Sequence, residues 1–416
     1  MLSAHNLAVL CSLKKKYAYL SSIKRPDSAK FLPDSLIFIC KKIAFAAAKP
    51  EELFCLRLAL LYAILFPWKI KTLFGQTMKE FTAFLLSEQE NISKALQAVT
   101  EKMPCSVQEI ARYAFLSGGK RLRPALTLLW YNLLKTQNKI THPSLSIYDA
   151  SIVLEMFHVA SLLHDDVLDN AELRRGKTSS HIKFGVRPCL LAGDALLAMG
   201  NKQMAEFQNV RLMQIISDAL LRTANGEIEE IEIAGKIPAG EQEYLDVIEG
   251  KTAWIIRSAC EVGAIMAGAS EENIARARDF GLNLGMAFQI VDDALDFSPE
   301  DVIGKPTGGD LRERKCTPPI YMYLQSLTAS EKEDFIKKFQ ANSNAVFETA
   351  QNLENGFTDE ELKIINQKII DAKFPEKTRE LAQSYLDKAR ESIAVFSNPY
   401  ANMLLEAITF IKERNK

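Results

Sequence analysis

The stretch LLHDDVLDNAELRRGK spans residues 162–177 and follows a segment, residues 151–163, that is apolar on almost every side. That segment predicts a helix buried in a larger helical protein. The charged side chains of interest are three aspartates and two arginines: Asp165, Asp166, Asp169, Arg174 and Arg175. Asp165 and Asp169 share a helix face, where like charges repel. Carboxylates clustered at a buried helix end cost desolvation free energy unless a cation binds, and such oxygen ligands suit Mg2+.

The chain repeats this pattern once. FQIVDDALDF, residues 288–297, places Asp292, Asp293 and Asp296 at the same spacing after another apolar helix. A single DDxxD segment is also explained by a solvated helix end with surface carboxylates. Two such segments, each behind an apolar helix, favour a polyanionic ligand that metal ions bridge to both sides.

The composition is that of an ordinary globular protein. The chain has 416 residues, of which 48% are hydrophobic and 25% charged, enough for one large or two ordinary domains. A formal net charge of −1 gives no general attraction to nucleic acid, so no nucleic-acid partner is expected. The seven cysteines are widely spaced without a CxxC pair, which predicts free thiols and a cytoplasmic location.

Residues 1–77 differ from the remainder. They carry 12 Lys/Arg against 4 Asp/Glu, whereas residues 78–416 carry 39 against 48. We therefore predict a basic N-terminal extension, residues 1–77, and a main domain, residues 78–416. The longest uncharged apolar run of the extension, residues 58–68, is too short to span a bilayer. Three interpretations stay open: a stretch upstream of a true start at Met78, a basic amphipathic element on an anionic membrane, and an organellar transit peptide.

From residue 78 onward the hydrophobic periodicity predicts an all-α fold. The predicted helices span residues 89–103, 106–115, 122–134, 147–169, 192–207, 212–234, 241–267, 271–296, 329–339, 358–371, 375–395 and 399–412. Glycines and prolines separate them. Strand-type alternation is nearly absent.

Six motifs together make the chain resemble the trans-isoprenyl diphosphate synthases, the polyprenyl synthetase family, from about Met78 onward. In chain order they are GGKRLRP (118–124), DDVLD followed by RRG (165–176), LAGDALLA (191–198), GKTA (250–253), DDALD preceded by Gln289 (289–296) and GKPTGGDL (304–311). The resemblance implies the isoprenoid synthase fold, a single large helical bundle around a central active-site cavity. It also implies a homodimer.

The activity that the resemblance implies is a Mg2+-dependent condensation of isopentenyl diphosphate with an allylic diphosphate. Asp165, Asp169 and Asp292 would ligate Mg2+ on the allylic diphosphate. An allylic cation forms as the C–O bond breaks, and the double bond of isopentenyl diphosphate attacks it. Electrostatic stabilisation and positioning would supply most of the catalysis. The catalytic residues implied are Asp165, Asp166, Asp169, Asp292, Asp293, Asp296, Lys251, Thr252 and Gln289.

Both diphosphates need direct contacts as well. For isopentenyl diphosphate the resemblance assigns Lys120, Arg123, Arg175 and His158. For the allylic side it assigns Arg174, Lys251, Lys305, Lys315, Thr252 and Gln289. Plainer alternatives are solvated cations at a helix start for GGKRLRP, a core histidine for His158 and a surface lysine for Lys251.

Two residues depart from the family pattern. Glu230 stands where long-chain members usually have Gln, and Arg314 stands where Gly usually precedes Lys315. A carboxylate at position 230 would add a metal contact or shift affinity. Arg314 would add positive charge or misplace Lys315.

Small residues before the first aspartate motif indicate product length. Ala160 and Ser161 lie five and four residues before Asp165, near where short-chain members place an aromatic floor. The resemblance favours Ala160 as a tunnel residue, and helical phase favours Ser161. Phe157 is either a lower floor or core packing. We expect a long-chain product that serves as a quinone side-chain precursor, with peripheral membrane contact during product release.

Three other functions compete with this one. A geranylgeranyl or farnesyl diphosphate synthase would differ in product length. A non-catalytic partner subunit would lack one or both aspartate motifs, and both are intact. A terpene cyclase would carry an Asn/Ser/Glu metal motif in place of DDALD.

Overall fold

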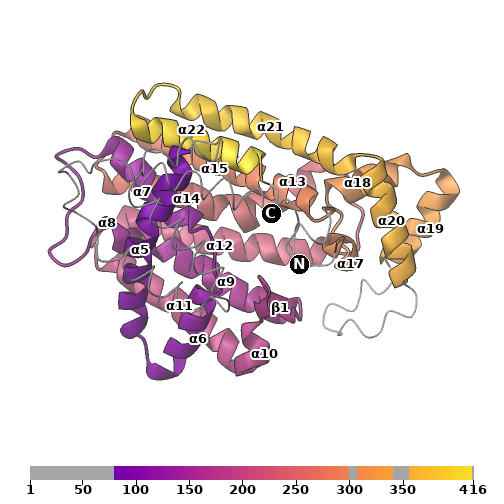
Figure 1. Cartoon of the computed structure of the whole chain (residues 1–416), viewed down its shortest axis with the longest axis horizontal. Coiled ribbons are helices and arrows are strands. Elements are labelled where there is room, and N and C mark those ends of the chain that lie inside the picture. The colour runs from indigo at the N-terminus through magenta and orange to yellow at the C-terminus, as the bar shows by residue number, and fades with distance from the viewer. Residues whose placement is uncertain (1–78, 299–306, 341–355, 415–416) are drawn as a thin grey trace, which may run out of the picture. The chain divides into compact units, whose positions relative to one another are not determined.

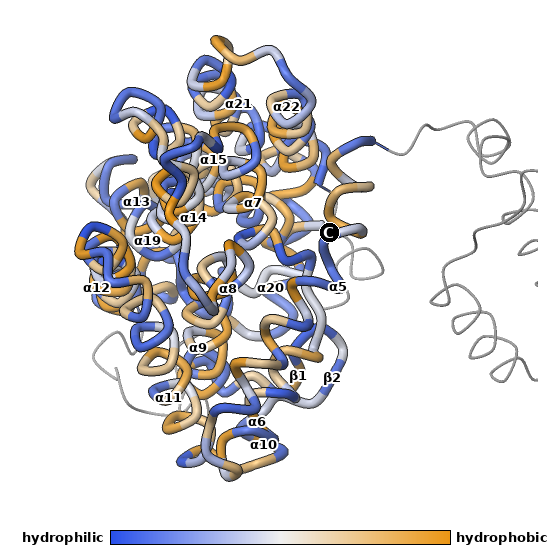
Figure 2. Tube along the Cα trace, turned by 90° about the vertical axis from the view of Figure 1, so that its left-hand side faces the viewer, coloured by the Kyte–Doolittle hydropathy of each residue, from blue (hydrophilic) through white to orange (hydrophobic). Residues whose placement is uncertain are grey.

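Helices account for nearly all of the described chain, which confirms the all-α fold class (Figure 1). The computed structural model describes residues 79–298, 307–340 and 356–414. Many helices carry hydrophobic and hydrophilic residues in turn along the tube (Figure 2), the amphipathic pattern that packs one stripe against a core. No helix in these ranges is long and apolar enough to cross a membrane.

The described chain is a series of helices interrupted by one two-stranded sheet. The described elements are α5 (Glu80–Glu101), α6 (Cys105–Leu116), α7 (Leu122–Leu134), α8 (Ile147–Ser151), α9 (Val153–Leu168), β1 (Leu173–Arg174), β2 (Lys177–Thr178), α10 (Ser180–Phe184), α11 (Val186–Ala205), α12 (Val210–Ile233), α13 (Glu241–Ile248), the π-helix η1 (Glu249–Ala253), α14 (Trp254–Met266), α15 (Glu271–Leu295), α17 (Gly309–Arg312), α18 (Pro318–Ser326), α19 (Ala329–Gln340), α20 (Asp359–Asp371), α21 (Phe374–Ile393) and α22 (Pro399–Lys412).

Three local predictions were wrong. The single helix predicted over residues 147–169 is two helices, α8 and α9, because the chain turns at Ile152. The helix predicted over 241–267 is interrupted by the π-helix η1. The short elements β1, β2, α10, α17 and α18 were missed, because segments of two to nine residues are too short to display a clear period.

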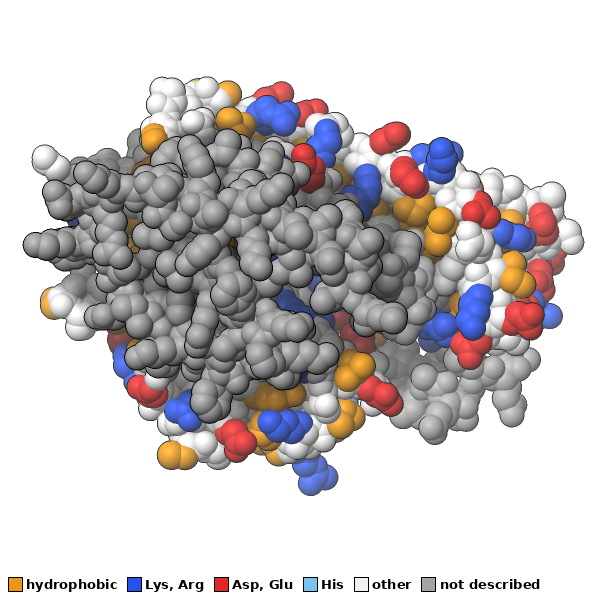
Figure 3. Space-filling model, in the orientation of Figure 1, with side chains coloured by type: hydrophobic (Ala, Val, Ile, Leu, Met, Phe, Trp, Pro, Cys, Tyr) orange, Lys and Arg blue, Asp and Glu red, His pale blue; other side chains and the backbone are white. Residues whose placement is uncertain are grey.

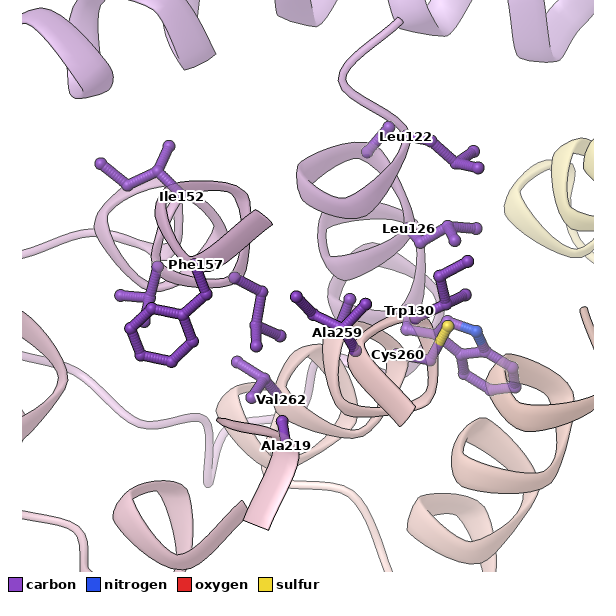
Figure 4. Packing of buried hydrophobic residues seen from close by; sticks show 14 of the residues in the cluster. Leu122, Leu126, Trp130, Ile152, Phe157, Ala219, Ala259, Cys260 and Val262 are labelled. Atoms are coloured by element: carbon purple, nitrogen blue, oxygen red, sulfur yellow. The ribbon is translucent and has the colours of Figure 1, made fainter. Parts of the chain in front are cut away.

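The main core lies where α14 packs against α7, α12 and α15, with α9 packed on α11. Figure 4 shows its side chains coming from α7, α9, α12 and α14, with Trp130 beside Cys260. Trp130 is fully buried and meets Phe280 edge-on at 5.6 Å between ring centroids. This packing holds the ends of α9 and α15, and hence both aspartate motifs, in the body of the protein.

A second, smaller core lies beyond the end of α15. Phe297, Leu311, Ile320, Phe339 and Ile369 are buried in it, and they come from α17 to α20 and from the residues after α15. The outer surface of this end carries Lys/Arg and Asp/Glu side chains side by side (Figure 3). The second core anchors the segment that bears Lys315 next to the second aspartate motif.

Candidate active site

The first aspartate motif lies at the C-terminal end of α9. Asp166 is buried and accepts a hydrogen bond from Arg174 Nε at 2.7 Å. Asp165 and Asp169 are four residues apart and share a helix face, and the charges of Glu227 and Lys251 act on both carboxylates. Burial, with the nearby Glu227 carboxylate, raises the pKa of Asp165 to about 7, against the opposing effect of Lys251. Burial also raises the pKa of Asp169. Both carboxylates therefore lie where an added cation is favourable.

The second aspartate motif lies at the end of α15. Asp293 accepts hydrogen bonds from Tyr244 Oη at 2.6 Å and from Gln289 Nε2 at 2.7 Å. Burial raises the pKa of Asp293 to about 7 in spite of these donors. Asp296 is buried and accepts from the backbone N–H of Asp310 at 3.0 Å. Asp293 and Asp296 thus face inward and are held by the protein.

Asp292 is the more exposed carboxylate of the second motif. Its Oδ1 lies 2.8 Å from Arg414 in an ion pair. Arg414 follows α22 and was missed by the sequence analysis, because nothing in the local pattern connects the end of the chain with residue 292. Asp292 therefore already has a cationic partner from the segment after α22.

Thr252 and Gln289 form a hydrogen-bonded chain with the second motif. Thr252 Oγ1 donates to Gln289 Oε1 at 2.7 Å, and the amide of Gln289 donates to Asp293. Thr252 belongs to the π-helix, a distortion that is frequent at functional sites. These contacts fix the orientation of the Gln289 amide.

The π-helix brings Lys251 onto α12 through a close backbone contact. A Cβ atom on Gly226 would lie 2.3 Å from Lys251 N, so only glycine fits at position 226. One turn later, Glu230 Oε2 lies 2.6 Å from Lys251 Nζ, and Glu227 lies 2.9 Å from it. Lys251 is therefore partly buried between carboxylates and is not a surface lysine.

Lys315 approaches the same carboxylate from the segment after α17. Its Nζ lies 3.0 Å from Glu230 and 2.7 Å from Glu313. The preceding residue, Arg314, has φ of +57°, a left-handed conformation that favours glycine, which accounts for the glycine usual at this position. With Arg314 in place, Lys315 still reaches Glu230.

The lysine pair connects the two aspartate motifs. The charges of Lys251 and Lys315 act on Asp165 and Asp169. The same lysines line one pocket with Gln289 and Asp293 of the second motif and with Asp310 of the GKPTGGDL segment. The structure thus brings the aspartates, Lys251, Lys315, Thr252 and Gln289 into one region.

A second pocket contains the predicted basic residues His158, Arg174 and Arg175. The Arg175 guanidinium donates to the Gly118 carbonyl, and a Cβ on Gly119, whose φ is +133°, would lie 2.8 Å from that guanidinium. Gly119 therefore leaves room for the Arg175 guanidinium, and Gly118 supplies the carbonyl that accepts from it.

Burial among these guanidinium groups lowers the pKa values of His158 and Arg123. Burial, together with Arg123 and Arg175, lowers the pKa of His158 well below its usual value, so the ring is neutral near pH 7. Burial lowers the pKa of Arg123 to about 10, which leaves it charged. His158 lines the pocket, so the plain core interpretation does not hold.

One buried ion pair supports this pocket and was missed. Arg121 Nη1 lies 2.7 Å from Glu155, and both side chains are largely buried. Glu155 is the only charged residue in the apolar run 151–163, a signal that could have identified it. Lys120 is exposed, with Nζ 4.7 Å from the Phe410 ring centroid. Lys305 and the extension 1–77 lie outside the described residues.

The donor set fits a hard divalent cation. Asp165, Asp169 and Asp292 offer only carboxylate oxygens, and burial disfavours the charged form of the first two. In the part of the chain that the structure describes, no three acidic, His or Cys side chains form a ready metal cage. Mg2+ commonly keeps water ligands and binds through one or two carboxylates plus substrate phosphates.

Comparisons with known proteins agree with this arrangement. The family model "Polyprenyl synthetase" matches residues 104–354. The heptaprenyl diphosphate synthase component 2 of Bacillus subtilis (strain 168) is 31% identical over 332 residues, 78% of this chain and 87% of that protein. The geranylgeranyl diphosphate synthase of Sulfolobus acidocaldarius is 33% identical over 55% of this chain and 70% of its own length.

A solved structure shares the fold. The polyprenyl synthase of Caulobacter crescentus CB15, in complex with calcium and isoprenyl diphosphate, superposes with a TM-score of 0.71 and 28% identity, over 82% of this chain and 100% of that one. That protein binds a divalent cation together with an isoprenyl diphosphate.

Proposed function

The chain belongs to the polyprenyl synthetase family, and from this premise we propose that it is a trans-polyprenyl diphosphate synthase. It condenses isopentenyl diphosphate with an allylic diphosphate into a long-chain product. The observation that carries the proposal is the pair of aspartate motifs on α9 and α15 with Lys251 and Lys315 between them. A heptaprenyl synthase component among its relatives supports the long-chain product.

Mg2+ is the proposed cofactor. Asp165, Asp169 and Asp292 would hold it, and when bound it supplies neutralisation of the charge on the leaving diphosphate. The calcium in the Caulobacter structure supports a divalent cation at such a site.

The protein's own cations bind and orient the two substrates in this proposal. Lys251 and Lys315 keep their charge at neutral pH, because carboxylate neighbours outweigh burial and raise both pKa values, that of Lys251 to about 12. They contact the allylic diphosphate. Arg123 and Arg175 contact isopentenyl diphosphate, and the neutral His158 adds a hydrogen bond without adding charge. Holding the two substrates together supplies much of the rate.

A homodimer is the proposed assembly. Large apolar side chains stand exposed on α11 and α12: Val186, Leu191, Leu221 and Ile228 are 47% to 69% exposed. Exposed apolar side chains on two neighbouring helices fit contact with a second copy of the chain. The name of the Bacillus relative, component 2, makes assembly with a different subunit the second candidate. Sedimentation velocity of the purified chain, with Leu221→Glu as a disrupting variant, distinguishes the two assemblies.

The remaining expectations rest mainly on the resemblance. A quinone side-chain precursor as the product and membrane contact during product release are proposals of this kind. The cytoplasmic location is supported by the free thiols of the four described cysteines.

The decisive test combines product analysis with two variants. The protein is incubated with labelled isopentenyl diphosphate, one of several allylic primers and Mg2+, and the products are sized. We expect polyprenyl diphosphates longer than geranylgeranyl, and loss of at least about nine-tenths of turnover, about 1.4 kcal/mol of barrier, in Asp292→Ala. Asp279→Ala, an exposed carboxylate on the same helix, is the matched control. Absence of any condensation in the unaltered protein would refute the proposal.

A further inference from the structure

We propose that Glu230 is a positioning residue that competes with the allylic diphosphate for Lys251 and Lys315, and thereby weakens the binding of diphosphate to the site. The inference rests on the proposed function and deepens it. It concerns a residue on α12 that belongs to neither aspartate motif.

One oxygen of Glu230 holds both lysines. Oε2 lies 2.6 Å from Lys251 Nζ and 3.0 Å from Lys315 Nζ. The two lysines come from different segments, the π-helix η1 and the chain after α17. Glu230 is thus a point where three segments of the protein meet through charge-assisted hydrogen bonds.

These contacts are largely shielded from water. The side chains of Glu230, Lys251 and Lys315 are 18%, 24% and 21% exposed. Burial acts to raise the pKa of the Glu230 carboxyl, but Lys315 and Lys251 together hold it below its usual value. Glu230 is therefore ionised at neutral pH, and its ion pairs are screened less by salt than surface pairs are.

The lysines have further acidic partners. Glu227 lies 2.9 Å from Lys251, and Glu313 lies 2.7 Å from Lys315. Formally, two positive charges face three carboxylates, which makes this cluster net negative before the aspartate motifs are added. A diphosphate that approaches without a metal therefore meets lysines already neutralised and carboxylates that repel it.

The position of Glu230 follows from the backbone. Gly226, one turn earlier on α12, touches the backbone of Lys251, so α12 and the π-helix cannot separate unless this packing opens. The diphosphate must therefore displace the carboxylate from the ammonium groups locally. Glutamine at position 230 has the same shape and keeps one acceptor oxygen, but it lacks the charge that holds the lysines.

The experiment measures binding without turnover. Titration calorimetry with inorganic diphosphate, with EDTA present, compares the unaltered protein, Glu230→Gln and Glu232→Gln. Glu232 is an exposed carboxylate on the same helix, so its variant removes the same charge away from the lysines. Because glutamine leaves the two ammonium groups less neutralised, we expect a Kd about tenfold lower, about 1.4 kcal/mol, in Glu230→Gln alone.

Steady-state kinetics supply a second measurement. The same variant should lower KM for the allylic diphosphate and leave KM for isopentenyl diphosphate unchanged, whereas general loss of folding would lower kcat without this split. Equal or weaker diphosphate binding in Glu230→Gln, with an unchanged melting temperature, would overturn the inference. If the melting temperature of Glu230→Gln drops, Glu230→Met, of similar length, replaces it. Tighter diphosphate binding in Glu230→Met supports the inference, and unchanged or weaker binding overturns it.

A repeat of the titration with Mg2+ separates this inference from the proposed function. Mg2+ should tighten diphosphate binding in all three proteins. If Mg2+ has no effect while Glu230→Gln still binds more tightly, the metal-dependent function fails and the role of Glu230 stands. If Mg2+ tightens binding and Glu230→Gln matches Glu232→Gln, the role of Glu230 fails and the proposed function stands.

Discussion

Asp165→Asn should abolish activity and stabilise the metal-free protein at the same time. The substitution keeps the shape of the side chain and removes a carboxylate whose charged form is disfavoured by burial and by Glu227. A metal ligand that is costly to keep ionised without its metal should show both effects. Each effect is measured separately.

The magnitude of the stabilisation follows from the pKa. The pKa of Asp165 rises from 3.8 to about 7, about 3 units at about 1.36 kcal/mol each, or about 4 kcal/mol at most. Because the side chain keeps some contact with water, we expect about half of this, about 2 kcal/mol. With an unfolding entropy of about 2.1 cal/mol/K per residue, that raises Tm by about 3 °C in a domain of this size.

The pH dependence has a defined sign. The folded state binds the Asp165 proton more tightly than the unfolded state, so the carboxylate costs no stability below its unfolded pKa near 3.8. The cost grows as pH rises and is complete above about 7. The gain in Asp165→Asn should therefore be largest at pH 8 and vanish near pH 4.

The assay is a pair of measurements on each protein. Melting curves with EDTA are recorded from pH 4 to 8, and turnover is measured with saturating Mg2+, with Asp279→Asn as the control. An unchanged or lower Tm at pH 8 would refute the burial cost. Turnover above about a tenth of the unaltered value would refute the role as metal ligand.

Three further predictions concern other parts of the chain. Glu155→Gln should destabilise the protein by about 3–5 kcal/mol in denaturant melts, because it leaves Arg121 buried without its ion pair; a loss below about 1 kcal/mol would contradict this. Ala160 is fully buried and Ser161 is partly exposed. Ala160→Tyr should therefore cost about 1–3 kcal/mol of stability by overpacking, and Ser161→Tyr should shorten the product. Melting curves and product sizing check both variants, and long products from both would rule out a tunnel wall here. A chain that starts at Met78 should melt cooperatively and stay active, and loss of the cooperative melt would place the extension in the core.

The local patterns were sufficient to predict the helical class and the two aspartate motifs. Apolar periodicity is a property of each segment, so the long helices were predicted, although α5 and α11 begin at residues 80 and 186 and not at the predicted 89 and 192. In the first motif the spacing DDxxD separates Asp166 from Asp165 and Asp169, because residues four apart share a helix face, whereas in the second motif Asp296 is buried although Asp292, four residues earlier, is partly exposed. Asp166 turns inward to Arg174, as this phase requires.

Contacts between segments that are distant in the sequence could not be predicted from those local patterns. Arg414 reaches Asp292 and Tyr244 reaches Asp293 across many residues of chain, and no local signal marks either pair. The π-helix lies where the backbones at Gly226 and Lys251 touch, a contact set jointly by two helices.

Glu230 shows most clearly the difference between what the sequence determines and what the tertiary structure determines. In the sequence, Glu230 stands where the family usually has Gln, and the effect of this difference could not be predicted. Its effect depends on two ammonium groups that tertiary packing brings to one carboxylate oxygen. Residue types and their periodicity determine which groups can act, because they are properties of the chain itself. The distances between these groups and their burial set their protonation states and their affinity for ligands, because electrostatic energy depends on separation and on exclusion of water. Distances and burial are properties of the packed structure alone.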